Sequence, residues 1–337
     1  MSAKNAFVIA LLLGLLTVIL SPFSFADREV EEVEERDFEM GPGGTVRIAL
    51  DEGYVHITTW DRSEVSMKMT KHARGKNKRE AQKRLEEIEI DIDHTRDHLT
   101  IRERSLDDRS YSIFDLLDPD TWSELSGRIT WVDFELSVPT KTNLIVDTDE
   151  GDIDISNVQG DIEVDTDEGK IELRRIRSDR LTVLTDEGDI FLERITSQDL
   201  QSSSRVEIDT DEGDAELIHV EVDRLKIESD EGDVVADMLR CERLDFYSDE
   251  GNIEADLELQ SGGDYRCRTD EGEVVLYLPS NASFDITARS QEGRIQSDFS
   301  LEVREVGDGE RADDVVGGGG AELYLFTEEG DIRLRKR

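Results

Sequence analysis

The chain has 337 residues, with 82 Asp and Glu against 40 Lys and Arg, which gives a formal net charge of −42. A surface this acidic repels nucleic acid and anionic lipid, so we expect neither as a partner. Apolar residues make up 36% of the chain, and they recur at regular intervals, which a disordered chain does not need. The length allows one long domain or two ordinary ones.

Residues 1–26 predict a signal peptide. Lys4 gives a weakly positive start, an apolar stretch runs from Ala6 to Leu20, and Ser24-Phe25-Ala26 is a small-x-small cleavage site. This stretch is short for a membrane span, which needs about 20 apolar residues, although an uncleaved N-terminal anchor is the alternative. We therefore expect export to the periplasm or the cell surface, and no integral membrane protein after cleavage.

Residues 27–138 predict a less regular N-terminal β-region. Apolar residues alternate from Val46 to Ile57 around the turn Asp51-Glu52-Gly53, which is one coil of the pattern described below. Residues 76–87 are rich in helix formers and predict a short helix. We expect this helix to cap the open end of the stack, with a basic recognition surface as the alternative.

Alternating apolar residues at 88–92 and 99–101 predict a hairpin. His94 and His98 lie in its turn beside Asp93 and Asp97, but a turn gives this spacing no fixed metal-binding geometry. Residues 105–127 are an insertion with several aromatic side chains. We expect it to pack on the flank of the stack, and an exposed patch for a partner or glycan is the alternative.

Residues 139–337 predict a repeat domain. The tripeptide Asp-Glu-Gly occurs eight times in the chain, and between Gly151 and Gly293 the glycines and one near-copy follow each other at steps of 18, 19, 25, 19, 19, 21 and 21 residues. Apolar residues stand seven and five positions before each Gly, a Thr or Ser usually stands three before it, and apolar residues stand two and four after it. A fixed period near 20 residues is typical of a solenoid.

Alternation on both sides of the Gly predicts two short strands per repeat, each with one buried face. A further apolar residue seven positions after the Gly predicts a third, shorter side. The fold class that follows is all-β, a parallel β-helix with coils of about 19–21 residues. In such a stack the apolar columns form ladders about 4.8 Å apart, and the Thr and Ser column can form hydrogen bonds along it.

The acidic pairs of the turns leave two interpretations open. They could form a ladder of oxygen ligands for calcium, or a solvated acidic edge that keeps the stack soluble. Stacked carboxylates repel by about 0.9 kcal/mol per pair in water at 4.8 Å, and neither the EF-hand loop nor the Gly-Gly-x-Gly-x-Asp repeat matches; we favour the solvated edge. The residues of the cation ladder would be Asp149, Glu150, Asp167, Glu168, Asp186, Glu187, Asp211, Glu212, Asp230, Glu231, Asp249, Glu250, Asp270 and Glu271.

Cysteine is sparse, since Cys241 and Cys267 are the only two. An exported chain is in a compartment that permits disulfides, so these residues could form one, or remain two buried thiols. No His lies near either in sequence, so neither is a candidate nucleophile. Residues 307–320 end in four glycines and predict a flexible excursion before the last coil.

Three strings resemble a known family: Phe134–Pro139 leading into Leu144–Ile155, then Val275–Ile295, then Gly320–Leu334. They resemble the exported bacterial "putative adhesin" family of unknown function, whose members are β-helices of Gly-x-Ile-x-Val coils. The resemblance implies a location in the cell envelope and a binding role, and it offers no catalytic residues. The uniformly acidic turns depart from the family pattern.

The leading hypothesis is therefore a non-enzymatic, exported structural or binding module of the cell envelope, without a cofactor and with a protein or glycan partner. One alternative is a surface adhesin stabilised by calcium. Another is an enzyme acting on polysaccharides, which would need acidic or basic residues that break the column pattern within a cleft. The irregular arginines, such as Arg174, Arg266 and Arg289, fall mostly on exposed positions.

Overall fold

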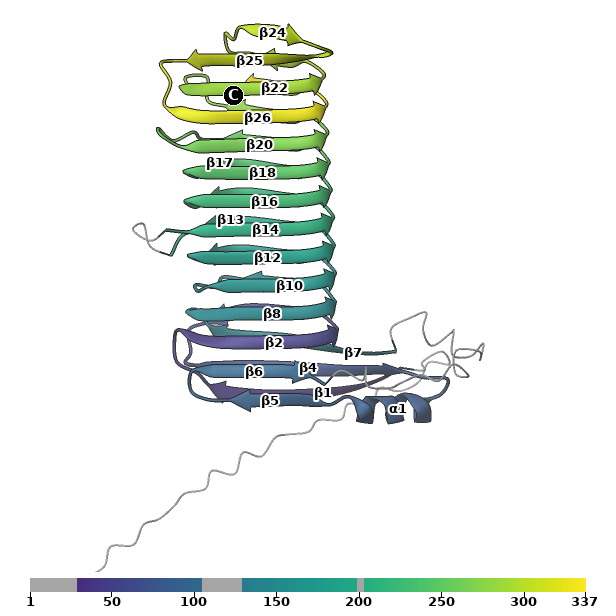
Figure 1. The fold of residues 1–337 in the computed structure, drawn as a ribbon. Helices are drawn as coiled ribbons and strands as arrows, with labels where there is room; N and C mark the ends of the chain where they lie inside the picture. Colours follow the sequence, from purple (N-terminus) through teal and green to yellow (C-terminus); the bar gives the residue numbers. More distant parts are fainter. Residues whose placement is uncertain (1–28, 105–128, 199–202) are drawn as a thin grey trace, which may run out of the picture.

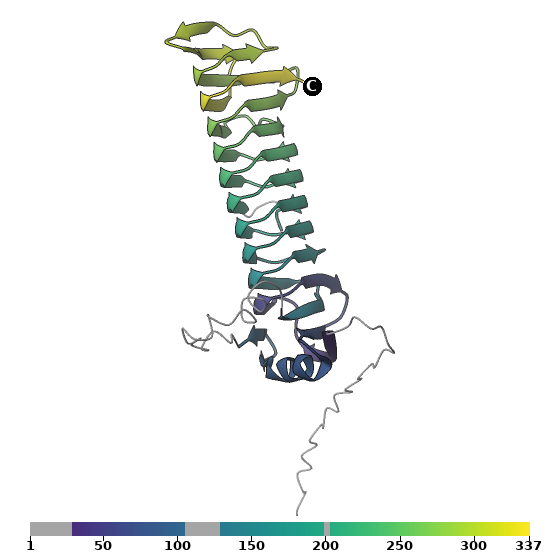
Figure 2. The same cartoon turned by 90° about the vertical axis from the view of Figure 1, so that its right-hand side faces the viewer.

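The computed structural model describes residues 29–104, 129–198 and 203–337. The predicted signal peptide and the aromatic insertion at 105–127 lie outside them. In the described part the fold is all-β with one helix, as two long sheets of 13 and 14 strands. Figure 1 shows the strands stacked along one axis, and Figure 2 shows the two sheets side by side.

Each regular coil gives one strand to each sheet. We call the 14-stranded sheet sheet B and the 13-stranded sheet sheet A. In stack order, sheet B contains β5 (Ile90–His94), β6 (His98–Glu103), β2 (Gly44–Glu52), β8 (Thr142–Glu150), β10 (Ile162–Glu168), β12 (Arg180–Glu187), β14 (Arg205–Glu212), β16 (Arg224–Glu231), β18 (Arg243–Glu250), β20 (Asp264–Glu271), β26 (Ala321–Glu329), β22 (Phe284–Glu292), β25 (Gly309–Val316) and β24 (Val303–Val306). Sheet A contains β1 (Glu29–Glu39), β4 (Glu64–Arg74), β7 (Thr130–Pro139), β3 (Val55–Trp60), β9 (Ile153–Ser156), β11 (Ile171–Arg177), β13 (Ile190–Thr196), β15 (Ala215–Glu221), β17 (Val234–Arg240), β19 (Ile253–Leu257), β21 (Val274–Leu278), β27 (Ile332–Lys336) and β23 (Ile295–Ser297).

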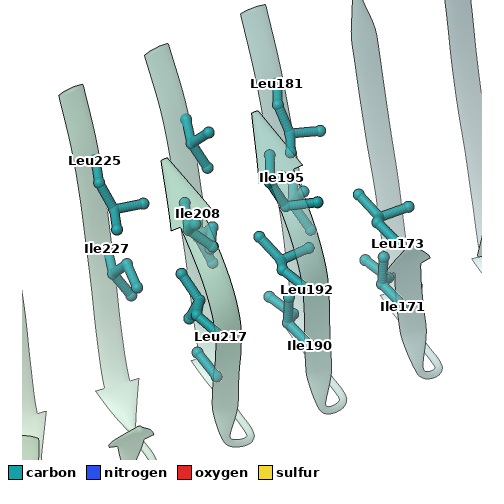
Figure 3. Close-up of a cluster of buried hydrophobic side chains, with 14 of the residues drawn as sticks. Ile171, Leu173, Leu181, Ile190, Leu192, Ile195, Ile208, Leu217, Leu225 and Ile227 are labelled. Carbon is teal, nitrogen blue, oxygen red and sulfur yellow. The ribbon is translucent and has the colours of Figure 1, made fainter. Parts of the chain in front are cut away.

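The predicted apolar columns form the core between the sheets. Successive strands pair in parallel and in register, so that Val164, Val183 and Ile208 lie directly over one another. Figure 3 shows the ladders, with Ile171 and Ile190 among their rungs. Because each buried aliphatic side chain contributes about 1.5–3 kcal/mol and touches the coils above and below, stability comes from neighbouring coils.

The expected third side is instead a continuation of sheet A. The apolar residue seven positions after the Gly, such as Ile176 or Ile195, pairs in the same strand as the earlier columns. One residue before it the chain takes a left-handed conformation and bulges, which returns the next side chain to the core side. This bulge recurs at the same column position: its residues are Asn157, Arg175, Arg194, His219 and Met238, with φ between 56° and 65°.

The predicted helix and hairpin are confirmed at the N-terminal end. Helix α1 (Lys78–Glu87) begins at Asn77, whose side chain accepts hydrogen bonds from the Arg79 and Glu80 amides. Its buried residues Ala81 and Leu85 face the stack, and the helix contacts β4 and β1. Strands β5 and β6 pair antiparallel as the hairpin, and β2 pairs with β8, so strands of the N-terminal region and the repeat region share the same sheets.

The C-terminal order differs from the simple succession that the repeats suggest. Strands β26 and β27 lie between the coil of β20 and β21 and the coil of β22 and β23. Residues 307–320, expected to be a flexible excursion, include most of β25, which pairs antiparallel with both β22 and β24. The hairpin of β24 and β25 therefore covers the end of sheet B, and the chain then returns into the stack (Figure 1).

Candidate functional site

The Asp-Glu-Gly turns stack along one edge, where sheet B strands pass into sheet A. A Cβ placed on Gly188 would lie 2.0 Å from the carbonyl oxygen of Gly169 in the coil below, and Gly188 has φ of +152°. Such contacts recur at Gly151 and Gly251, whose φ lies outside the left-handed range. Close approach between coils therefore requires glycine at more turns than positive φ does.

The Thr and Ser column lies just inside these turns and is buried. As predicted, its hydroxyls form hydrogen bonds along the stack: Thr148 Oγ1 donates to Thr166 Oγ1 at 2.9 Å, and Thr269 Oγ1 donates to the carbonyl of Gly251 at 2.9 Å. In three middle coils the hydroxyls of Thr185, Thr210 and Ser229 lack a hydrogen-bond partner.

The acidic residue that follows the turn glycine has a structural role that the sequence did not reveal. The side chain of Asp214 accepts a hydrogen bond from the amide of Asp233 at 2.9 Å, and Asp233 accepts from the amide of Asn252 at 2.7 Å. Asp152 and Asp331 make the equivalent bond to neighbouring coils. These carboxylates satisfy amides that the turn leaves unpaired by its strands.

The two acids of each turn point outward and are mostly exposed. The glutamates are in register, for example Glu168, Glu187 and Glu212, yet in the described part of the chain the turn acids do not group as three ligand atoms within 4.8 Å of one another. Calcium binding at these turns, from Asp149 and Glu150 to Asp270 and Glu271, therefore stays a prediction.

Carboxylates next to the turns show the effect of the crowded negative charge. Partial burial raises the pKa of Asp165 above its ordinary value, and the charges of Asp147 and Asp167 raise it further. Burial also raises the pKa of Asp209, and Glu228 adds to this effect while Lys226 opposes it. The acidic edge is thus a region of high proton affinity, and of repulsion at neutral pH.

The cysteines are buried free thiols rather than a disulfide in this structure. Burial raises the pKa of Cys241 to about 12, and it raises the pKa of Cys267 as well. The hydroxyl of Tyr265, itself buried, donates to the carbonyl oxygen of Cys241 at 2.7 Å. Thiols held protonated in this way are poor nucleophiles.

The opposite edge of sheet B carries a ladder of arginines. Arg180, Arg205, Arg224 and Arg243 occupy the first position of four successive strands and pair in register. All four are exposed. In the column, Asp161 comes before them and Asp264 after them, so the ladder is bounded. We define these four residues as the arginine ladder.

The arginine ladder is unusual in a chain with twice as many acids as bases. Within the described ranges, the side chains of Arg180, Arg224 and Arg243 form no ion pair; Arg205 reaches Glu207 at 2.7 Å. Adjacent in-register cations repel by about 0.9 kcal/mol in water at 4.8 Å. Four of them in succession lower stability slightly, which favours a role outside the fold.

Shallow grooves follow the arginine ladder along the outer face of sheet B. Two of them share Arg205 and Arg224, and a third continues from Asp264 and Arg266 toward the C-terminal end. The other charged residues on this face are largely neutralised already: Lys226 lies 2.6 Å from Glu228 and 3.6 Å from Glu207. The free cationic groups of the groove are therefore those of the ladder.

Comparison with known proteins gives the family. The Toastrack DUF4097 family matches residues 45–335. The chain belongs to this family. The match is consistent with the Gly-x-Ile-x-Val resemblance seen in the sequence, and it spans both the predicted N-terminal region and the repeat region.

Solved structures that resemble this Toastrack chain do so at low identity. A "putative cell adhesion protein" from Clostridium sporogenes is 11% identical, with 92% of this chain and 100% of that chain covered and a TM-score of 0.31. A "putative adhesin" from Bacteroides fragilis is 12% identical, with 91% and 97% covered and a TM-score of 0.31. A "putative lipid binding protein" from Parabacteroides distasonis is 11% identical, with 89% and 96% covered and a TM-score of 0.33.

No curated protein matches the chain. Among the helices of the described ranges, none has the length and apolar character needed to cross a membrane.

Proposed function

We propose that this Toastrack protein is an exported, non-enzymatic binding module of the cell envelope, in the periplasm or at the cell surface, and that it binds an acidic polysaccharide along the arginine ladder. Export is supported by the leader-like residues 1–26. A non-enzymatic role is supported by the repetition of the acids in columns, because an active site is a single constellation.

The observation that carries the proposal is the ladder itself. Guanidinium groups form bidentate hydrogen bonds with carboxylate and sulfate groups. Here four stand at a spacing of about 4.8 Å along a groove, three of them without an ion pair within the described ranges. An evenly spaced row of cations suits a linear polymer with evenly spaced anions better than an acidic protein, whose charges have no fixed repeat.

The large negative charge of the chain does not prevent this binding. The arginine ladder and the acidic turns lie at opposite ends of the sheet B strands, six residues apart, which corresponds to about 20 Å. The Debye length at physiological ionic strength is about 8 Å. The turn carboxylates are therefore largely screened from a ligand seated on the ladder.

The test is binding to immobilised polygalacturonate, a uronate polymer, in 0.15 M NaCl with neutral dextran as reference. We expect Arg224→Gln/Arg243→Gln to weaken binding about tenfold or more, since each charge-assisted bond contributes about 1.5–3 kcal/mol. The matched control is Arg304→Gln/Arg311→Gln, which removes the same charge from the C-terminal hairpin, where both arginines are exposed. Equal weakening by the control, or equal binding to dextran, would contradict the proposal.

A further inference from the structure

A second cluster of polar side chains lies at the other end of the molecule, on the outer face of sheet A. Strands β1 and β4 pair antiparallel, with Glu31 directly opposite His72 and Glu29 two residues earlier on the same face. Oε1 of each glutamate lies 3.8 Å from Nδ1 of His72. The three side chains each present one ligand atom, and these atoms all lie within 4.8 Å of one another.

The imidazole of His72 is held in place from its other side. Its Nε2 lies 3.0 Å from Oδ2 of Asp133 on β7, and its ring stacks on Trp131 with centroids 4.7 Å apart and planes at 4°. The side chain is only 11% exposed, and Nδ1 is buried without a hydrogen-bond partner. One ring nitrogen thus faces a carboxylate while the other is directed at two more.

This arrangement is the one that metal-binding histidines adopt, because the nitrogen that does not bind the metal usually donates to a carboxylate. Glu29 is oriented in the same way: Arg74 Nε donates to its Oε2 at 2.9 Å, so Oε1 remains directed at His72. The four side chains come from β1, β4 and β7, which are joined as neighbours in the sheet.

We propose that Glu29, Glu31 and His72 bind one Zn²⁺ ion, with Asp133 as the positioning residue for the imidazole. Imidazole together with carboxylates suits zinc, whereas calcium and magnesium prefer oxygen ligands alone. Tetrahedral bonds of about 2.0–2.1 Å place ligand atoms about 3.3 Å apart. The separations of 3.8 Å need to close by only about 0.5 Å, and water completes the coordination.

Zinc at this position joins β1 to β4 beside the cap helix, and so fastens the first described strand to the end of the stack. The alternative explanation of the cluster is a protonated His72 that acts as a cation among carboxylates. This explanation predicts no metal binding above the weak background of the acidic turns.

The test is calorimetric titration of the full chain with Zn²⁺ at pH 7.5, in 10 mM MgCl₂ to saturate the acidic turns. We expect one tight site in the unchanged protein. Glu31→Gln removes a ligand from an exposed position and is expected to abolish the site. Asp133→Asn is expected to weaken it about 10- to 100-fold. Glu35→Gln, an exposed glutamate on the same face of β1, is the control and should bind as the unchanged protein does.

Titration with Co²⁺ gives a second readout that a merely structural role would not change. We expect visible absorption bands of tetrahedral cobalt in the unchanged protein and in Glu35→Gln, and their loss in Glu31→Gln. The proposal is overturned if no site is tighter than the acidic-turn background, if Glu31→Gln keeps the same stoichiometry and affinity, or if the cobalt bands are absent.

Discussion

Glu103 offers a direct test of how negative charge limits the stability of this fold. It lies at the end of β6, where burial raises its pKa to about 7 from an ordinary 4.5, and the carboxylates of Asp51 and Glu52 contribute to the shift. Its Oε2 accepts a hydrogen bond from the Asp51 amide at 3.3 Å. The folded protein therefore holds the Glu103 proton more tightly than the unfolded chain does.

The sign of the pH dependence follows from this difference in proton binding. A carboxyl whose pKa is raised on folding contributes most at pH below 4.5, and its contribution falls as pH rises through the folded value near 7. The loss between pH 5 and pH 8 is about 2–3 kcal/mol, because each unit of pKa shift corresponds to about 1.4 kcal/mol. Above about pH 8 this group causes no further change.

Glu103→Gln removes the charge and can still accept the bond from the Asp51 amide. Urea unfolding at pH 5 and pH 8 is the assay. At pH 8 we expect the variant to have a free energy of unfolding about 2–3 kcal/mol higher, relative to the unchanged protein, than at pH 5. The control is Glu254→Gln, an exposed carboxylate on β19. The reasoning is refuted if the stabilisation is the same at both pH values, or no larger than in the control.

Two further predictions concern the turns. Gly188→Ala is expected to destabilise the stack by more than 2 kcal/mol, because its Cβ would lie 2.0 Å from the Gly169 carbonyl oxygen and the backbone is in a region that L-residues avoid; Gly41→Ala, with no atom within 4 Å of the added Cβ, should change the unfolding midpoint little, and equal midpoints for the two variants would contradict the close-packing argument. For the acidic edge, melts in CaCl₂, in MgCl₂ and with chelator at constant ionic strength should give similar midpoints if it is only solvated; an upward shift specific to calcium would favour the cation ladder.

The sequence predicted the features that repeat. The apolar columns, the glycine turns and the two strands per coil follow from period-two alternation, which leaves one face to bury. The bulge at Arg175 and Arg194 was not predicted, because nothing in a single column marks a left-handed residue when it is neither Gly nor Asn. It explains why the apolar residue after it looked like a third side.

The order of the last coils could not be read from the sequence for a different reason. The coils of β20, β22 and β26 have the same column pattern, so each presents an equally suitable surface to either neighbour. Only the long connection from Ile295 to Ala321 indicated that the chain leaves the stack, and it did not indicate where the chain returns.

The two proposed sites differ in how visible they were. The arginine ladder stands in one column of the repeat, eight positions before the glycine, and could have been found by aligning polar columns as carefully as apolar ones. The cluster of Glu29, Glu31 and His72 depends on the antiparallel register of β1 and β4. That register lies outside the repeat, and no spacing in the sequence reveals it.

The placement of β26 and β27 within the stack has a consequence for how the molecule assembles. Until these strands arrive, β20 has an unpaired edge on one side of the vacancy and β22 has one on the other, and such open edges can pair with other chains. The two halves of the stack are joined only when this coil enters, like the keystone of an arch. Growth by addition of coils at the tip is therefore not open to this solenoid, since its closing element sits inside it.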